Sequence, residues 1–345
     1  MNNKITALAR ESVLALTPYQ SARDEFRGQA SLYLDANENP FVTGFNRYPD
    51  ARQQRLKEAV AKLKKVSPAQ LLLTNGSDEA IDLLIRAFCN PGKDTIIIPQ
   101  PTYGMYATYA AINDVSIKTV NLKPDFTLDM DAVQAAITPS TKMIFLCSPN
   151  NPTGNLLAES AVISLLNTFK GLVVVDEAYI DFTGKPGWIR QLGKYRNLVV
   201  LHTFSKAWGL AGLRLGACIA DPEVIELITK IKPPYNISSY SEQRVIREIS
   251  SNRSKVKQQV SLLIRERKAL ARALSQIPIV KHIYPSDANF LLVKVLDAET
   301  TYWKLIEQGI VVRNRSGMMH CDNCLRITVG TPIQNRRLIN VMNQL

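Results

Sequence analysis

Apolar runs of strand length alternate with amphipathic helical patterns between residues 70 and 220. The runs are nearly continuous in apolar side chains, which is typical of strands buried on both faces of a mostly parallel sheet. The expected strands are Leu71–Thr74, Thr95–Ile98, Met143–Leu146, Leu172–Val175, Leu198–His202 and Ala217–Ile219. Helices are expected at Asp78–Phe88, which Asn90-Pro91-Gly92 ends, and at Ala158–Phe169. This part of the chain therefore predicts a large α/β domain.

The pattern changes after Lys232-Pro233-Pro234, where Ser241–Ile277 predicts one or two long polar helices. A smaller α+β unit follows, with elements expected at Asn289–Val293, Thr301–Gln308 (helix), Ile310–Arg313, Cys324–Val329 and Ile333–Asn343 (helix). We therefore expect an N-terminal arm (1–38), a large domain (39–240) and a small C-terminal domain (241–345). A cleft between the last two is the default ligand site.

Basic residues exceed acidic ones by 42 to 30, which gives a formal net charge of +12. This excess predicts attraction to anions, either nucleic acid or small phosphorylated ligands. The positive charge gathers in Arg52–Lys65 and Arg253–Arg272, where Ala, Leu and Val recur at helical spacing. We interpret both stretches as solvated faces of amphipathic helices. Neither is interleaved with aromatic side chains that stack on bases, so nucleic-acid binding is not expected.

Composition excludes several classes of protein. Hydrophobic residues make up 46% and charged residues 21%, as in an ordinary globular chain. No uncharged apolar run approaches the ~20 residues that a membrane span needs. Charged residues interrupt Met1–Pro18, where a signal peptide would have an apolar core. We therefore expect a cytoplasmic protein without membrane contact.

The five cysteines are scattered, which argues against a disulfide framework. Cys321-Asp-Asn-Cys324, next to His320, has the spacing of a metal-binding pair. A closed zinc site usually takes four ligands, and no second pair exists in the sequence. We therefore expect a turn beside a strand and no metal site.

Polar motifs follow the expected strands at their carboxyl ends, where open α/β sheets bind ligands. In Asn75-Gly76-Ser-Asp78, Gly76 permits close backbone approach and a helix N-terminus offers N–H groups to an anion. A simple N-cap explains this motif equally well. Ser148–Gly154 holds two prolines and two asparagines, a rigid turn suited to positioning a side chain. Asp176 emerges from an apolar strand and is either solvent-facing or paired with a cation.

Lys206 follows Thr203-Phe-Ser and precedes a run of small and apolar residues. Lysine is rarely buried without a task, and a desolvated lysine with a lowered pKa is a standard nucleophile for carbonyl carbon. A surface lysine whose stem lies on apolar surface is the alternative. Arg214, Ser205 and the turn at Ser77 would together suit a phosphate group.

These motifs, in their order, resemble those of the fold-type I, aspartate-aminotransferase-like enzymes that use pyridoxal 5′-phosphate (PLP). The resemblance is closest to the histidinol-phosphate branch of that family, and Thr17-Pro-Tyr-Gln20 and Arg47-Tyr-Pro49 point toward this branch. The stretches that carry it are Leu16–Arg23, Leu34–Pro40, Arg47–Pro49, Asn75–Phe88, Pro101–Tyr106, Ser148–Gly154, Asp176–Tyr179, Thr203–Gly216 and Leu325–Gly330. The implied fold is a large domain with a mostly parallel sheet flanked by helices and a small α+β C-terminal domain.

The resemblance implies roles around the cofactor. Lys206 would hold the cofactor aldehyde and then move the proton between the substrate α-carbon and C4′. Asp176 would pair with the pyridine nitrogen. Tyr179 and Asn151 would hydrogen-bond the ring 3′-oxygen, and Tyr103 would stack on the ring unless it is a core tyrosine. The residues that would hold the phosphate are Gly76, Ser77, Asp78, Thr203, Ser205 and Arg214.

The resemblance also implies substrate contacts. Arg326 resembles the arginine that binds an α-carboxylate in general aminotransferases, and here it would bind a phosphate ester. Arg313 would be a second arginine for that phosphate, unless it is an exposed charge at a strand end. Tyr19 and Asn37 would be further substrate contacts. Tyr48 would enter the site of a neighbouring subunit, which requires a homodimer.

The implied reaction is PLP-dependent transamination between L-histidinol phosphate and 2-oxoglutarate, giving imidazole-acetol phosphate and L-glutamate, a step of histidine biosynthesis. An aromatic or broad-range aminotransferase and a threonine-phosphate decarboxylase of the same fold remain alternatives. The chain departs from the family pattern in its short segment between Pro40 and Arg47 and in Tyr235–Ser239. A nucleic-acid regulator built on this fold is disfavoured, because the cofactor motifs are retained.

Overall fold

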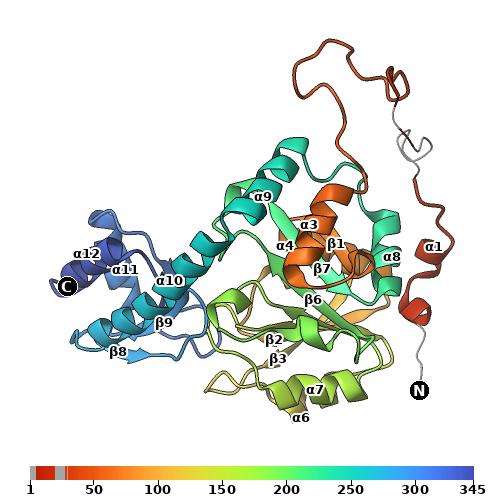
Figure 1. The fold of residues 1–345 in the computed structure, drawn as a ribbon. Coiled ribbons are helices and arrows are strands. Elements are labelled where there is room, and N and C mark those ends of the chain that lie inside the picture. Colours follow the sequence, from red (N-terminus) through yellow and green to blue (C-terminus); the bar gives the residue numbers. More distant parts are fainter. Residues whose placement is uncertain (1–4, 20–27, 29) are drawn as a thin grey trace.

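The computed structural model describes residues 5–19, 28 and 30–345 (Figure 1). A seven-stranded sheet has the order β1-β7-β6-β5-β4-β2-β3, and a four-stranded sheet has the order β10-β11-β9-β8. The strands are β1 (Leu71–Asn75), β2 (Thr95–Gln100), β3 (Ser116–Asn121), β4 (Thr141–Cys147), β5 (Leu172–Asp176), β6 (Leu198–Thr203), β7 (Leu215–Ala220), β8 (Val280–Ile283), β9 (Phe290–Val295), β10 (Arg313–Asn314) and β11 (Cys324–Thr328).

The helices surround these two sheets, and short 3₁₀ turns join several of them. The α-helices are α1 (Glu11–Leu14), α3 (Gln54–Lys64), α4 (Gly76–Phe88), α5 (Met105–Ile112), α6 (Met130–Ala136), α7 (Glu159–Thr168), α8 (Pro222–Ile231), α9 (Ser239–Ser251), α10 (Arg253–Leu274), α11 (Ala298–Glu307) and α12 (Pro332–Met342). The 3₁₀ turns are η1 (Ile5–Leu8), η2 (Pro68–Gln70), η3 (Ile180–Phe182), η4 (Trp188–Gln191) and η5 (Ala211–Leu213). No helix in these described ranges is long and apolar enough to cross a membrane.

The large sheet is mostly parallel, as the sequence predicts. Strands β2 to β6 pair in parallel, and β7 runs antiparallel to its neighbours β1 and β6. All six strands expected from the apolar runs are present. The seventh, β3, lies at the edge of the sheet, and Val120 is the one buried residue among its six; Ser116, Thr119 and Asn121 are exposed. Its polar character explains why no apolar run predicts it.

Buried apolar side chains cover both faces of this sheet, because successive residues of a strand point to opposite faces. In β5, Leu172 and Val174 belong to the core under α4, α5 and α8. Val173 and Val175 belong to the core under α3, α6 and α7. The same alternation places Asp176 on the first face, and the following Glu177 on the second.

The C-terminal elements form a unit around the smaller sheet, whose strands all run antiparallel. Helices α10, α11 and α12 supply its core, and α9 and α10 lead into it from the large sheet (Figure 1). The predicted helical stretch Ser241–Ile277 is two helices, which break at Asn252. Strand β8 is missing from the sequence prediction because Lys281 and His282 at its centre are exposed. The domain boundaries at residues 38 and 240 stay a prediction.

The segment around Cys321 and Cys324 is a turn that leads into β11, as predicted. The Cys324 N–H donates to the Cys321 carbonyl oxygen, and the Cys321 N–H donates to the Met318 carbonyl oxygen. His320 and Asn323 have left-handed backbone conformations that reverse the chain. Both cysteine side chains are buried in the apolar core.

Candidate active site

The central cavity lies where the N-terminus of α4 and the carboxyl ends of β4, β5 and β6 meet, and its volume is about 180 Å³. It is lined by Gly76, Ser77, Asp78, Tyr103, Cys147, Asn151, Asp176, Ala178, Tyr179, Thr203, Ser205, Lys206, Ala211 and Arg214. The structure thus brings together all eleven residues that the sequence predicts around the cofactor. Their individual roles stay predictions.

Close backbone packing shapes the phosphate end of this cavity. Gly76 has a φ of +72°, and a Cβ there would lie 2.5 Å from Nη2 of Arg214. A Cβ on Gly216 would lie 2.3 Å from the carbonyl carbon of Gly76 and 2.4 Å from the amide nitrogen of Ser77. Glycine at both positions lets β7 pass directly beside the first turn of α4. The N–H groups of a first helical turn have no intrahelical partners, so this corner suits an anion.

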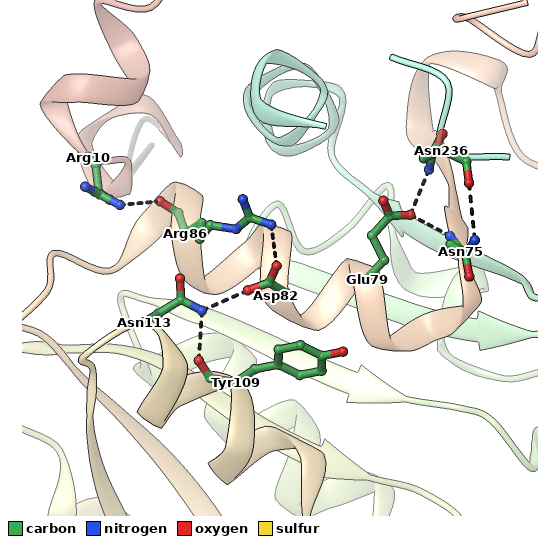
Figure 2. Close-up of polar contacts among 8 residues, drawn as sticks. All are labelled: Arg10, Asn75, Glu79, Asp82, Arg86, Tyr109, Asn113 and Asn236. Carbon is green, nitrogen blue, oxygen red and sulfur yellow. Dashed lines mark hydrogen bonds and ion pairs between the residues drawn. The ribbon is translucent and has the colours of Figure 1, made fainter. Parts of the chain in front are cut away.

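Hydrogen bonds along α4 hold this corner in place (Figure 2). Glu79 Oε2 accepts from the Asn75 N–H at 2.5 Å and from Asn236 Nδ2 at 2.7 Å. One turn further along, Asp82 Oδ1 accepts from Asn113 Nδ2 at 2.8 Å. These bonds tie the first turn of α4 to Asn236 and its middle to Asn113. The helix N-terminus is therefore a preorganised feature of the cavity.

Asp176 is the buried acid of the central cavity, with only 3% of its surface exposed. Its carboxylate accepts hydrogen bonds from Tyr106 Oη at 2.7 Å and from the Ala178 N–H at 3.0 Å. Burial raises the pKa of Asp176 to about 6, and these two hydrogen bonds oppose that rise. A buried carboxylate held in this way fits a protonated ring nitrogen, which would supply the missing positive charge.

Lys206 lines the cavity and remains accessible through its opening. Its Nζ lies 5.8 Å from the centroid of the Tyr179 ring. Burial lowers the pKa of Lys206, and the positive charge of Arg326 lowers it further. A lysine whose amine is more easily neutral is a better nucleophile toward a carbonyl carbon.

A series of side-chain hydrogen bonds links the central cavity to the C-terminal sheet. Asn151 Nδ2 donates to Tyr179 Oη at 3.4 Å, and Asn151 Oδ1 accepts from Arg326 Nη1 at 2.5 Å. Arg326 also lies over the Phe290 ring, 5.3 Å from its centroid. The residue expected to bind the ring 3′-oxygen is therefore in contact with the residue expected to bind substrate.

A third arginine, which the sequence reasoning missed, lies in this region. Arg313 pairs with Arg326 across β10 and β11, and Arg315 follows two residues later. Arg315 Nε is buried and has no hydrogen-bond partner within the described parts of the chain. Burial lowers the pKa of Arg315, as do the charges of Arg326 and Arg313. The spacing of two residues in an extended segment, which puts Arg313 and Arg315 on one face, is the signal that could have found it.

The remaining predicted residues lie outside the central cavity. Asn37 and Tyr48 line a neighbouring cavity of about 750 Å³ that shares Arg214 with the central one. Tyr48 is 53% exposed and stacks on Tyr235, with ring centroids 4.5 Å apart. Tyr19 is 70% exposed and lines a different cavity. The structure therefore brings Asn37 and Tyr48, but not Tyr19, to the phosphate end of the site.

The donor set of the central cavity fits PLP. It combines a corner suited to a phosphate, a buried carboxylate for a ring nitrogen and a lysine of lowered pKa for the aldehyde. Tyr103 adds an aromatic ring beside them, and its Oη donates to Asp78 Oδ1 at 3.1 Å.

Comparison with known proteins agrees with this reading of the site. The family model for aminotransferase class I and II matches residues 38–342. A histidinol-phosphate aminotransferase of Parabacteroides distasonis is 48% identical over 338 residues, which cover 98% of each chain.

Solved structures share the fold. The crystal structure of a histidinol-phosphate aminotransferase from Clostridium acetobutylicum superposes with a TM-score of 0.80 at 24% identity, over 87% of this chain and 91% of the other. A Sinorhizobium meliloti histidinol-phosphate aminotransferase in complex with PLP gives a TM-score of 0.79 at 22% identity, over 87% and 83%. From the matched family model and the identity over nearly the whole chain, this protein belongs to the PLP-dependent class I and II aminotransferases and, within them, to the histidinol-phosphate aminotransferase family.

Proposed function

We propose that this aminotransferase moves the amino group of L-histidinol phosphate to 2-oxoglutarate, giving imidazole-acetol phosphate and L-glutamate in histidine biosynthesis. The observation that carries the proposal is the 48% identity to relatives of that name over 98% of the chain. Arg326, which donates to the cavity-lining Asn151, and Arg313, its partner across β10 and β11, support it, because a phosphate dianion needs more than one cation.

Within the reaction, PLP supplies an electron sink for the carbon from which a proton is removed. Lys206 would act as the base that takes the proton from the amine-bearing carbon of the substrate and as the acid that returns it on the cofactor side. Its lowered pKa favours the neutral amine that can act as this base. Asp176 would hold the pyridine nitrogen in its protonated form, which would make the sink effective. Asn151 and Tyr179, which are hydrogen-bonded to each other, would bind the 3′-oxygen of the ring and orient it.

Arg313 and Arg326 hold the charged end of each substrate in turn. L-histidinol phosphate presents a phosphate there, whereas glutamate and 2-oxoglutarate present a carboxylate. The planar guanidinium group binds either anion with two parallel hydrogen bonds, which the ammonium group of lysine does not. Asn37 and Tyr19 are proposed as further substrate contacts.

We also propose that the enzyme works as a cytoplasmic homodimer, with Tyr48 entering the site of the partner subunit. Tyr48 is exposed, and it lies in a cavity that shares Arg214 with the central one. An exposed tyrosine beside the phosphate corner is well placed to act across a subunit boundary.

The test is to incubate the purified holoenzyme with 2-oxoglutarate and each of several amino donors and to measure L-glutamate. L-histidinol phosphate should be the best donor by kcat/KM. Faster turnover of aromatic amino acids would favour the broad-range aminotransferase. Release of CO₂ from L-threonine O-3-phosphate would favour the decarboxylase, and either result would contradict the proposal.

A further inference from the structure

The two basic stretches of the sequence meet at a second cavity, on the other face of the large sheet. Lys64 and Lys65 at the end of α3 and Arg253 and Lys257 at the start of α10 line it. Lys185 and Arg190, from the loop that follows β5, line it as well. This basic cavity, defined by these six cations, has a volume of about 760 Å³.

These cations are not neutralised by the protein. None of the six forms an ion pair or a side-chain hydrogen bond with any residue that the structure describes. Lys64 instead lies over the Phe204 ring, with Nζ 5.9 Å from its centroid. Asp181 is the single acidic residue among those lining the cavity. Six like charges around one concavity repel each other, so binding of an anion there would be favourable.

The rest of the wall is apolar. Trp208, Ile189, Val256 and Val260 line the same cavity as the cations. A concave site of this size that mixes apolar walls with a few charged groups is typical of small-molecule binding. Nucleic acid, by contrast, takes an extended basic surface that follows its backbone. The combination indicates a ligand with an anionic end and a flat or apolar body.

A buried polar pair lies at the floor of the basic cavity. His202 lines the cavity, and its Nε2 is 2.9 Å from Oε2 of Glu177, with both side chains almost fully buried. His202 Nδ1 has no hydrogen-bond partner in the part of the chain that the structure describes. Burial lowers the pKa of His202, and the positive charge of Lys64 lowers it further. An unpartnered nitrogen here is a further polar contact for a ligand.

We propose that the basic cavity binds a phosphorylated small molecule with a ring, of the nucleoside phosphate class, at a site separate from the central cavity. The phosphates bind the lysines and arginines of α3, α10 and the loop, and the ring packs on the apolar wall beside Trp208. The inference does not depend on which amino donor the enzyme uses. Ala207 and Trp208, which line the basic cavity, directly follow Lys206 in the chain.

The test is calorimetric titration of the PLP-loaded enzyme with adenosine triphosphate at physiological salt. We expect saturable binding, and no binding of adenosine, which lacks the phosphates. Lys257→Gln should weaken the binding about tenfold, because it removes one charge-assisted contact. Lys255→Gln is the matched control: it removes the same charge from the same helix, but Lys255 does not line the cavity. It should change the affinity less than about twofold.

Two further measurements test whether adenosine triphosphate binds at the basic cavity. Acetylation of Lys64 and Lys185 by an amine-reactive reagent should slow when adenosine triphosphate is present, whereas acetylation of Lys255 should not. Arg313→Ala, at the position proposed to bind the phosphate of the amino donor, should leave the affinity for adenosine triphosphate unchanged. The proposal is overturned by absence of binding, by equal losses in the Lys257 and Lys255 variants, or by loss of binding in Arg313→Ala. None of these outcomes bears on the amino donor, so the two proposals fail independently.

Discussion

The central cavity and the basic cavity lie on opposite faces of β5 and β6 and differ in the side chains that line them. Asp176 and Thr203 belong to the central cavity, and their chain neighbours Glu177 and His202 are buried on the other face, with His202 in the floor of the basic cavity. Each face buries one acid. Asp176 accepts from Tyr106 and Ala178, whereas Glu177 accepts from the Trp188 N–H at 2.8 Å and contacts His202.

The difference lies in what faces each acid. Asp176 lines an open cavity, and burial raises its pKa to about 6 although hydrogen bonds from Tyr106 and Ala178 oppose the rise. Glu177 is enclosed, and burial raises its pKa to about 8. A carboxyl group enclosed by the protein serves the fold, whereas one that lines a cavity can contact a charged ligand. The surroundings of each carboxyl group, more than residue type, thus separate the acid that we propose binds the cofactor from the structural one.

Lys206→Ala should give the largest effect. It removes both the bond to the cofactor and the base for proton transfer, so transamination should fall by at least about 10⁴-fold. The variant should remain folded, with an unchanged thermal unfolding temperature, because the side chain makes no hydrogen bond or ion pair that the structure records. Transamination by this variant at a measurable fraction of the normal rate would contradict the assignment of Lys206.

Substitution of Asp176 and of Glu177 compares how much the acid on each face of β5 contributes to kcat. Asp176→Asn removes the charge that holds the ring nitrogen protonated, and kcat should fall on the order of 10²-fold or more. Glu177→Gln is the matched control, and its kcat should stay within about threefold of normal. Equal losses of kcat in the two variants would show that burial on either face matters equally to the chemistry.

Asp176→Asn should raise the stability of the cofactor-free enzyme, although it lowers kcat of the complete enzyme. The folded-state pKa of Asp176, about 6, exceeds its reference value of 3.8, so the folded state holds the proton more tightly. This contribution to the free energy of unfolding is fully present below pH 3.8 and is lost as the pH rises through about 6. Asp176→Asn should therefore stabilise the cofactor-free enzyme by up to about 3 kcal/mol at neutral pH.

Urea unfolding of the two cofactor-free proteins, repeated from acidic to neutral pH, measures this effect. The stability difference should grow with pH and then level off above the pKa of Asp176. A difference that is independent of pH would mean that Asp176 is not the titrating group.

Arg313→Ala should give the smallest effect of the series. L-histidinol phosphate should lose about tenfold in kcat/KM, the value of one charged hydrogen bond, and L-glutamate should lose less. Kinetics of the two half-reactions measure this split. Equal losses for both substrates would remove the proposed phosphate role of Arg313.

The sequence predicted most of the fold and the composition of the central cavity. Apolar runs predict buried strands such as Leu172–Asp176. The residues that the sequence predicts around the cofactor follow these strands in recognisable motifs. Edge elements do not: β3 and β8 expose polar side chains, so their sequences resemble loops. The start of β10 also lies at Arg313, later than the apolar run Ile310–Arg313 suggested.

What the sequence did not reveal depends on contacts between distant segments. Tyr106 lies in the motif Pro101–Tyr106, but its hydrogen bond to Asp176 joins residues 70 positions apart in the chain. The sequence places Lys64 and Lys257 on two separate solvated helix faces. Only the packing of α3 and α10 around the loop after β5 brings the two lysines to one cavity. Periodicity reports which face of an element is polar, and tertiary structure decides what that face meets.

The most direct test of the account is the absorbance of the purified, PLP-loaded enzyme during addition of L-histidinol phosphate without an acceptor. The band of the lysine-bound cofactor should convert to that of the amine form, and 2-oxoglutarate should restore it. Lys206→Ala should not complete this cycle. A band that L-histidinol phosphate leaves unmoved, while another amino donor converts it, would contradict the proposed substrate.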